Sequence, residues 1–143
     1  MEDLSLHILD VIENSLRAGA SNVDIRMIEN KNRATLTLEI EDDGKGMNES
    51  SLRRADDPFF TTKRGKKYGL GLALLAQAAE ETGGTLKVVN GAKRGTKIVA
   101  SFKLESIDLK PMGDIEGTLK LLRAAHRDVA FSINYRIENE APA

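Results

Sequence analysis

Three polar residues near the amino terminus have the types and the spacing for metal and phosphate chemistry. Asp10, Asn14 and Arg17 are four and three residues apart in a segment with helical apolar periodicity, so their side chains leave one line of a helix surface. An amide oxygen could ligate a hard cation such as Mg²⁺, a carboxylate could orient or deprotonate a water, and a guanidinium could pair with phosphate oxygens. Most surface helices carry a polar stripe, so this helix on its own is more typical of a solvated face.

A second candidate is the turn that begins at Asp42 and continues through Gly44 and Gly46. The carboxylate only accepts hydrogen bonds, and it ends an alternating apolar run beside backbone that lacks Cβ atoms. A flat ligand could approach there, and an amino group on an aromatic ring would suit the carboxylate. By itself the pattern also fits an Asx turn that leaves a strand, and Met47 beside it fits a core position.

A third candidate is the Gly69-x-Gly71 pair, which opens a stretch rich in alanine and leucine. The first backbone N–H groups of a helix are unpaired, and the helix dipole attracts phosphate to them. Neither a P-loop nor a Rossmann turn fits, because no Gly-Lys-Ser or Gly-Lys-Thr follows and the third glycine is missing. Basic residues just before the pair strengthen the attraction for an anion: Lys63, Arg64, Lys66 and Lys67.

The elements that must position these residues follow from apolar periodicity. Helices are predicted over residues 4–17, 49–55 and 69–83 and, after Pro111, over a segment capped by Asp114. Strands are predicted over residues 22–29, 34–40, 85–89, 97–104 and 129–137. Helices interspersed with strand pairs indicate an α+β sandwich, a two-layer fold in which one mixed sheet is covered on one face by helices.

Composition excludes several classes of function. A chain of 143 residues with 41% hydrophobic and 30% charged residues is typical of one soluble globular domain. The absence of cysteine excludes disulfides, thiolate zinc sites and cysteine nucleophiles. A net charge of −1 and 4% aromatic residues argue against nucleic acid and anionic membranes as partners. No apolar run could span a bilayer, and the acidic start does not fit a signal peptide, so we expect a cytoplasmic protein.

Together, and in this order, the segments resemble the GHKL superfamily of ATP-binding domains, which sensor histidine kinases, gyrases, heat-shock chaperones and mismatch-repair ATPases share. The resemblance spans about residues 4–104, and it implies the Bergerat-type ATP-binding fold over residues 1–104, with residues 105–143 as a helix and strand extension of the same domain. The matching segments are residues 10–20 (DVIENSLRAGA, the N box), 42–47 (DDGKGM, the G1 box), 58–63 (PFFTTK, the F box), 69–74 (GLGLAL, the G2 box) and the Gly95-Thr96 pair.

The resemblance also implies roles for single residues. Asn14 would ligate Mg²⁺, and Asp42 would accept a hydrogen bond from the adenine amino group, with Thr96 supporting the base. Asp10 would be the catalytic carboxylate, although the hydrolytic branch has a glutamate there and aspartate is one methylene shorter. The other implied nucleotide-binding residues are Arg17, Gly44, Gly46, Met47, Phe60, Thr62, Lys63, Gly69, Leu70, Gly71 and Leu72.

The function that the resemblance implies is a Mg²⁺-ATP-binding domain that acts with an unidentified protein partner or phosphoacceptor, by ATP hydrolysis or phosphotransfer. Two alternatives stay open: a protein kinase that acts in trans, as anti-sigma serine kinases do, and a non-catalytic ATP-sensing module. Neither His7 nor His126 lies in the phosphoacceptor box of sensor kinases, so we expect no self-phosphorylation. The segment after residue 104 could pack on a sheet edge or form the dimerisation strand of a homodimer.

Overall fold

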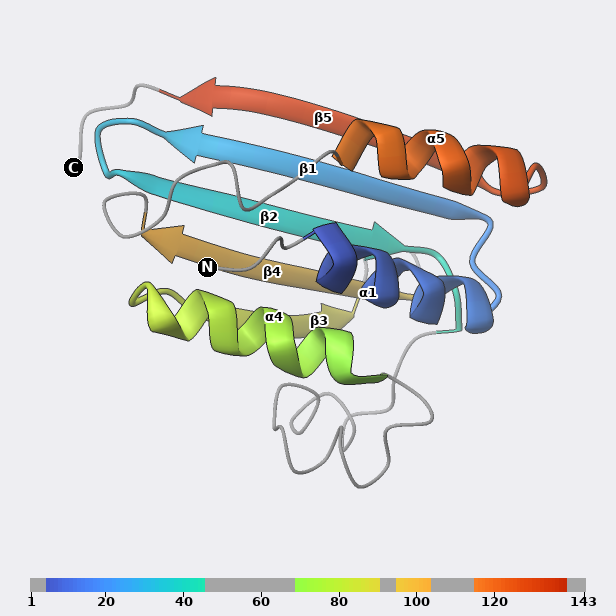
Figure 1. Ribbon diagram of the computed structural model, residues 1–143, viewed down its shortest axis with the longest axis horizontal. Helices are drawn as coiled ribbons and strands as arrows, with labels where there is room; N and C mark the ends of the chain where they lie inside the picture. Colours follow the sequence, from blue (N-terminus) through green and yellow to red (C-terminus); the bar gives the residue numbers. More distant parts are fainter. Residues whose placement is uncertain (1–4, 46–68, 91–94, 104–114, 139–143) are drawn as a thin grey trace.

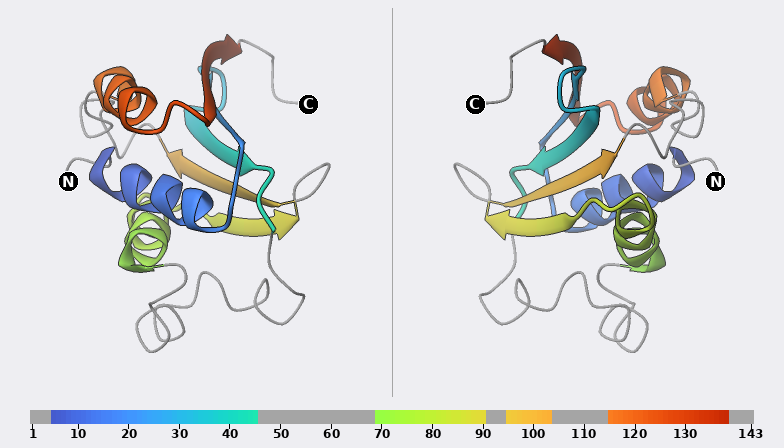
Figure 2. Two further views of the ribbon diagram at one scale, coloured as in Figure 1. Left: turned by 90° about the vertical axis from the view of Figure 1, so that its right-hand side faces the viewer. Right: turned by 90° about the vertical axis from the view of Figure 1, so that its left-hand side faces the viewer.

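The described residues form one five-stranded sheet with helices on one of its faces (Figures 1 and 2). The computed structural model describes residues 5–45, 69–90, 95–103 and 115–138. The strand order is β3-β4-β2-β1-β5. The helices are α1 (Ser5–Arg17), α4 (Gly69–Glu81) and α5 (Ile115–Ala125), and the strands are β1 (Asn22–Asn30), β2 (Thr35–Asp42), β3 (Leu86–Asn90), β4 (Thr96–Lys103) and β5 (Ala130–Glu138).

The sheet is mixed, and its pairing follows from the connections. A short turn joins β1 to β2, which therefore pair antiparallel with Val23 opposite Asp42 and Asn30 opposite Thr35. Strand β4 pairs antiparallel with both β2 and β3. Strand β5 follows α5 and pairs parallel with β1, with Asn22 opposite Ala130. The predicted mixed sheet with helices on one face is therefore confirmed.

The core lies between the sheet and the helices, because every second residue of the central strands faces the helical layer. Strand β2 alternates between part-buried polar residues and the buried residues Leu36, Leu38 and Ile40. On the opposite face of the sheet, Arg26 bonds Glu39 and Glu41, each at 2.8 Å. The helices contribute buried residues at helical spacing, among them Ile8, Val11, Ile12, Leu72, Leu75, Ala79 and Leu119.

Strand β5 departs from the half-buried pattern that its sequence predicts. Phe131 is buried, but Tyr135 and Ile137, on the same face of the strand, are each 48% exposed. Helix α5 has 11 residues and lies beside the first half of β5 (Figure 1). The second half of the strand therefore keeps an apolar face that no described helix covers.

The predicted short helix over residues 49–55 lies outside the described residues. In the part of the chain that the structure describes, no helix is long and apolar enough to cross a bilayer.

Candidate functional site

The candidate site is organised around Asp42, the last residue of β2. Its side chain is buried, with 7% of the residue exposed. Ser15 Oγ donates to Asp42 Oδ2 at 2.7 Å, and Gly44 N donates to Asp42 Oδ1 at 2.9 Å. Both carboxylate oxygens are therefore held in position, and each keeps lone-pair capacity for a further donor.

Glycines allow other backbone segments to approach Asp42 closely. Gly95 has φ +91°, and a Cβ on it would lie 2.1 Å from the Asp42 carbonyl oxygen and 2.9 Å from Oδ1. A Cβ on Gly44 would lie 2.9 Å from the carbonyl oxygen of Ala18, at the end of α1. Thr96, which follows Gly95, is also buried. Only residues without a side chain fit at these two contacts, so backbone at the start of β4 and after α1 packs closely against the end of β2.

The neighbouring Asp43 has a different role, which the sequence does not reveal. One of its oxygens accepts from the backbone N–H groups of Ser21 and Asn22, at 2.8 and 2.9 Å, and the other accepts from Asn22 Nδ2 at 2.8 Å. The side-chain bond from Asn22, followed by its backbone bond, lowers the Asp43 pKa from 3.8 to about 2. Asp43 therefore ties the turn before β1 to the end of β2.

Asn14 and Arg17 lie on α1 on either side of Ser15, which bonds this carboxylate. Arg17 Nη1 donates to Asn14 Oδ1 at 2.5 Å, and Arg17 Nη2 lies 4.0 Å from Glu13 Oε2. Asn14 and Asp10 are part-buried. Because Ser15 follows Asn14 directly, the helix turn that offers the amide oxygen is the same turn that bonds Asp42. The structure thus brings the candidate metal ligand, the candidate phosphate contact and the candidate base acceptor to the carboxyl end of α1.

The predicted glycine-rich helix start is present, since α4 begins at Gly69. The first N–H groups of a helix have no partner within the helix, and they lie at the positive end of its dipole. The Leu72 side chain is buried in the core, so only its backbone could reach a ligand. The predicted residues Gly46, Met47, Phe60, Thr62 and Lys63 lie outside the described residues.

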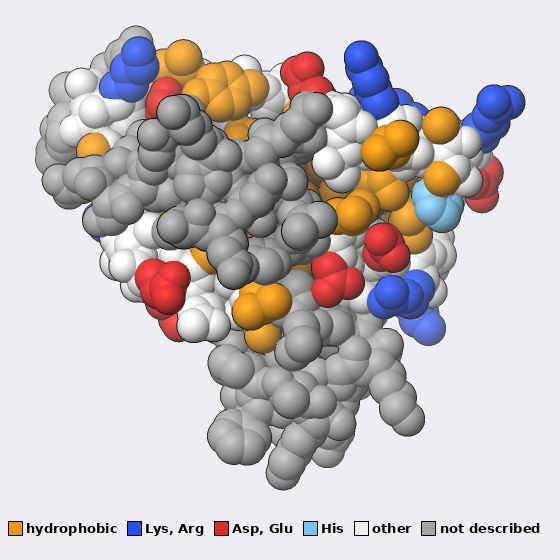
Figure 3. All heavy atoms as spheres, in the orientation of Figure 1, with side chains coloured by type: hydrophobic (Ala, Val, Ile, Leu, Met, Phe, Trp, Pro, Cys, Tyr) orange, Lys and Arg blue, Asp and Glu red, His pale blue; other side chains and the backbone are white. Residues whose placement is uncertain are grey.

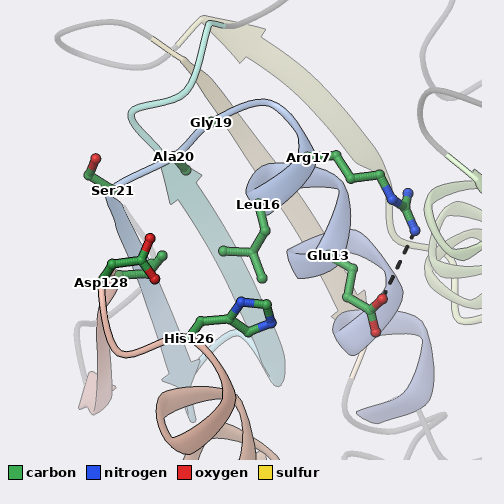
Figure 4. A pocket seen from close by; sticks show the side chains of 9 residues that line it. Glu13, Leu16, Arg17, Gly19, Ala20, Ser21, His126 and Asp128 are labelled. Atoms are coloured by element: carbon green, nitrogen blue, oxygen red, sulfur yellow. Dashed lines mark ion pairs between the residues drawn. The ribbon is translucent and has the colours of Figure 1, made fainter.

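Sequence reasoning missed a pocket of about 440 Å³ on the α5 side of α1 (Figure 4). Leu16 and the His126 ring project into it from opposite walls, and Asp128 lies at its edge. Apart from Arg17, no lining residue was predicted to bind nucleotide. Its lining comes from segments far apart in the chain: Glu13, Leu16, Arg17, Gly19, Ala20, Ser21, His126, Asp128 and Val129.

Comparison with known proteins assigns the chain to one family. The family model described as histidine kinase-, DNA gyrase B- and HSP90-like ATPase matches residues 2–106. The chain belongs to this family, which confirms the resemblance that the sequence motifs indicated.

Individual relatives agree with this assignment. The sensor histidine kinase ZraS of Escherichia coli is 29% identical over 74% of this chain and 23% of its own length. The ATP binding domain of PrrB from Mycobacterium tuberculosis is 27% identical, with a TM-score of 0.54, over 68% of this chain and 64% of that one. The N-terminal domain of a DNA repair protein shares the fold at 14% identity, with a TM-score of 0.54, over 94% of this chain and 50% of that one. The chain thus spans less than a quarter of the sensor kinase.

Proposed function

We propose that this chain binds Mg²⁺-ATP in the site around Asp42 and uses it together with a partner protein. The observation that carries the proposal is the buried carboxylate at the end of β2, held by Ser15 and Gly44 and enclosed by glycine backbone. Membership of the ATPase family and the similarity to the ATP binding domain of PrrB support it.

The adenine base fits this carboxylate because their hydrogen-bonding groups are complementary. A carboxylate accepts and cannot donate, and the adenine amino group donates. Both oxygens of Asp42 are held by donors, one from α1 and one from the turn after β2, so a base finds the acceptor already oriented. Thr96 lies next to Gly95 at the same end of the sheet and is the proposed second support for the base.

Asn14 is the residue that would hold Mg²⁺. In the part of the chain that the structure describes, no group of three or more His, Cys, Asp and Glu side chains could hold a metal ion. Mg²⁺ is often held by only one or two protein oxygens together with substrate phosphates, so a single amide oxygen fits that mode. Arg17 Nη1 donates to that oxygen at 2.5 Å, and in this proposal Arg17 turns from it to phosphate when the metal binds. When bound, the metal would neutralise phosphate charge.

Arg17 and the start of α4 are the proposed phosphate contacts. Arg17 is 4.0 Å from Glu13 and exposed enough to turn toward an anion. The backbone of Gly69, Leu70 and Gly71 opens α4 and offers N–H groups to phosphate oxygens. Lys63, just before α4 in the chain, is proposed for the same role. Asp10, one turn before Asn14, is the proposed carboxylate for orienting a water.

The metal assignment is tested by the Asn14→Ala variant. We expect ATP affinity in Mg²⁺ to fall at least about tenfold, because the loss of groups that merely support metal ligands already costs 10–100-fold in metal affinity. Affinity in EDTA should change little. Gln77→Ala, on the exposed surface of α4, is the matched control. Equal losses for Asn14→Ala in Mg²⁺ and in EDTA would contradict the assignment.

The fate of the γ-phosphate separates the candidate activities. Incubation of the chain and its co-purifying proteins with γ-labelled ATP yields free phosphate if the chain hydrolyses ATP, and a labelled partner if it is a kinase that acts in trans. Binding without either product indicates an ATP-sensing module. We expect no label on the chain itself, and acid-labile phosphate on His7 or His126 would contradict that expectation.

A further inference from the structure

Strand β5 forms one edge of the described sheet, and this edge is long. Within the described residues β5 pairs only with β1, over nine residues, whereas β3 at the other edge has five. A long edge strand offers unpaired backbone groups to another chain, and native edges are usually short or interrupted. No proline occurs between Ala130 and Glu138.

The backbone groups that face outward can be identified from the bonds at the two ends of β5. Ala130 N donates to the Ser21 carbonyl at 2.8 Å, and the Glu138 carbonyl accepts from Lys31 N at 3.1 Å. Even-numbered residues of β5 therefore point their N–H and C=O groups toward β1. Successive residues alternate, so the outward groups belong to Phe131, Ile133, Tyr135 and Ile137.

We propose that two copies of this chain join their β5 edges antiparallel about a two-fold axis at Asn134, which makes one continuous sheet. In this register every outward residue meets an outward residue of the other copy, and each such pair exchanges two backbone hydrogen bonds. The pairs across the interface are Phe131 with Ile137, Ile133 with Tyr135, Ser132 with Arg136, Ala130 with Glu138, and Asn134 with itself.

The side chains favour this register over its neighbours. The pairs on the helical face join aliphatic to aromatic side chains, and no two like charges meet directly, an arrangement that stabilises cross-strand pairs. An axis at Arg136 would place two guanidinium groups opposite each other. With an axis at Ile133, the outward groups of Ile137 would have no partner within the other β5. With an axis at Tyr135, the outward groups of Phe131 would have none. The axis at Asn134 alone pairs all nine residues of the strand.

The second copy would also cover the apolar surface that α5 leaves exposed. Tyr135 and Ile137 are each 48% exposed, and hydrophobic side chains gather at the end of the molecule where β5 ends (Figure 3). In the proposed register, Ile137 lies opposite the partner's Phe131, which sits at the end of β5 that the partner's α5 accompanies. The two-fold axis therefore brings each α5 toward the uncovered half of the other β5.

One hydrogen bond from α5 already uses an outward backbone group of β5. Arg123 Nη2 donates to the Phe131 carbonyl at 3.0 Å. A carbonyl oxygen has two lone pairs, so it can accept from Arg123 and from the partner's Ile137 at once. The other outward groups of the strand have no such contact among the described residues.

Cysteine cross-linking tests the register, because the chain contains no cysteine of its own. Asn134 is exposed, and the proposed axis places it directly opposite its own copy, at about 4.5 Å between Cα atoms, within the range of a disulfide. Under mild oxidation most of the Asn134→Cys variant should become a covalent dimer. Ser132→Cys is the matched control, since its copies would be about 14 Å apart and should not cross-link. A mixture of Ser132→Cys and Arg136→Cys should give the mixed dimer.

The mass of the unmodified full chain provides the second measurement. Light scattering during size exclusion should give twice the 15.6 kDa of one chain at high concentration, with or without ATP. A chain that stays at 15.6 kDa at several hundred micromolar overturns the proposal. Equal cross-linking of Ser132→Cys and Asn134→Cys overturns the register.

Discussion

Gly95 packs so closely against Asp42 that a single methyl group there tests the role of this carboxylate. In Gly95→Ala the new Cβ would lie 2.1 Å from the Asp42 carbonyl oxygen, whereas real Cβ contacts essentially never fall under 3.0 Å. Asp42 or the start of β4 must therefore move by about 1 Å. A hydrogen bond to a charged group contributes about 1.5–3 kcal/mol, so its loss should weaken ATP binding roughly 10- to 100-fold.

Gly83→Ala is the matched control for this substitution. Gly83 has φ +89° against +91° for Gly95, so both variants carry the same backbone strain, about 1–2 kcal/mol. The nearest atom to a Cβ on Gly83 is Lys103 Cγ at 3.6 Å, an ordinary contact away from Asp42. Calorimetric titration with ATP should show weakened binding for Gly95→Ala alone, with circular dichroism confirming that both variants fold. Unchanged affinity in Gly95→Ala, or an equal loss in Gly83→Ala, would refute the reasoning.

Two further substitutions probe the bonds around the site. Ser15→Ala removes the donor to a buried carboxylate, so we expect a loss of about 1–3 kcal/mol in unfolding free energy and weaker ATP binding. Ser132→Ala is the control, because it removes an exposed hydroxyl bonded to Asp24. It should change neither the denaturant melt nor the ATP titration. Asn22→Ala should raise the Asp43 pKa from about 2 toward 3.8, as an NMR titration of the carboxyl can show. A lowered pKa of Asp43 stabilises the fold at pH values above the unfolded pKa of 3.8. The difference in unfolding free energy between Asn22→Ala and the unmodified chain should therefore shrink as the pH falls from about 4 to 2. A difference that stays constant would contradict this role of Asn22.

Much of the fold could be predicted because local patterns and packing agree. The alternation of Leu36, Leu38 and Ile40 predicts a half-buried strand, and β2 has that burial. The predicted helix over residues 4–17 corresponds to α1, which ends at Arg17, before Gly19 with φ +83°. The parallel pairing of β5 with β1 could not be predicted, because it depends on how α5 crosses the sheet. The exposure of Tyr135 also depends on α5, which does not reach that end of β5.

The candidate site, too, could be predicted only in part from the sequence. Spacing on one helix was enough to place Asn14 and Arg17 together, since positions three apart share a face. Two adjacent aspartates cannot be told apart by composition, yet only Asp42 is buried against Ser15, while Asp43 bonds the turn before β1. The contribution of Ser15 was missed because it arises between residues 27 positions apart. The roles of all these residues in nucleotide binding stay predictions, and so does the division of the chain at residue 104.

The most direct test of the central claim, that Asp42 receives the adenine base, is a calorimetric comparison of ATP and GTP binding to the unmodified chain in Mg²⁺. Adenine presents an amino donor where guanine presents the O6 acceptor, so GTP would place a second acceptor against the buried Asp42 carboxylate. That mismatch costs about 1–3 kcal/mol, which predicts ATP binding roughly 10- to 100-fold tighter than GTP. Equal affinities for the two nucleotides would contradict the role of Asp42.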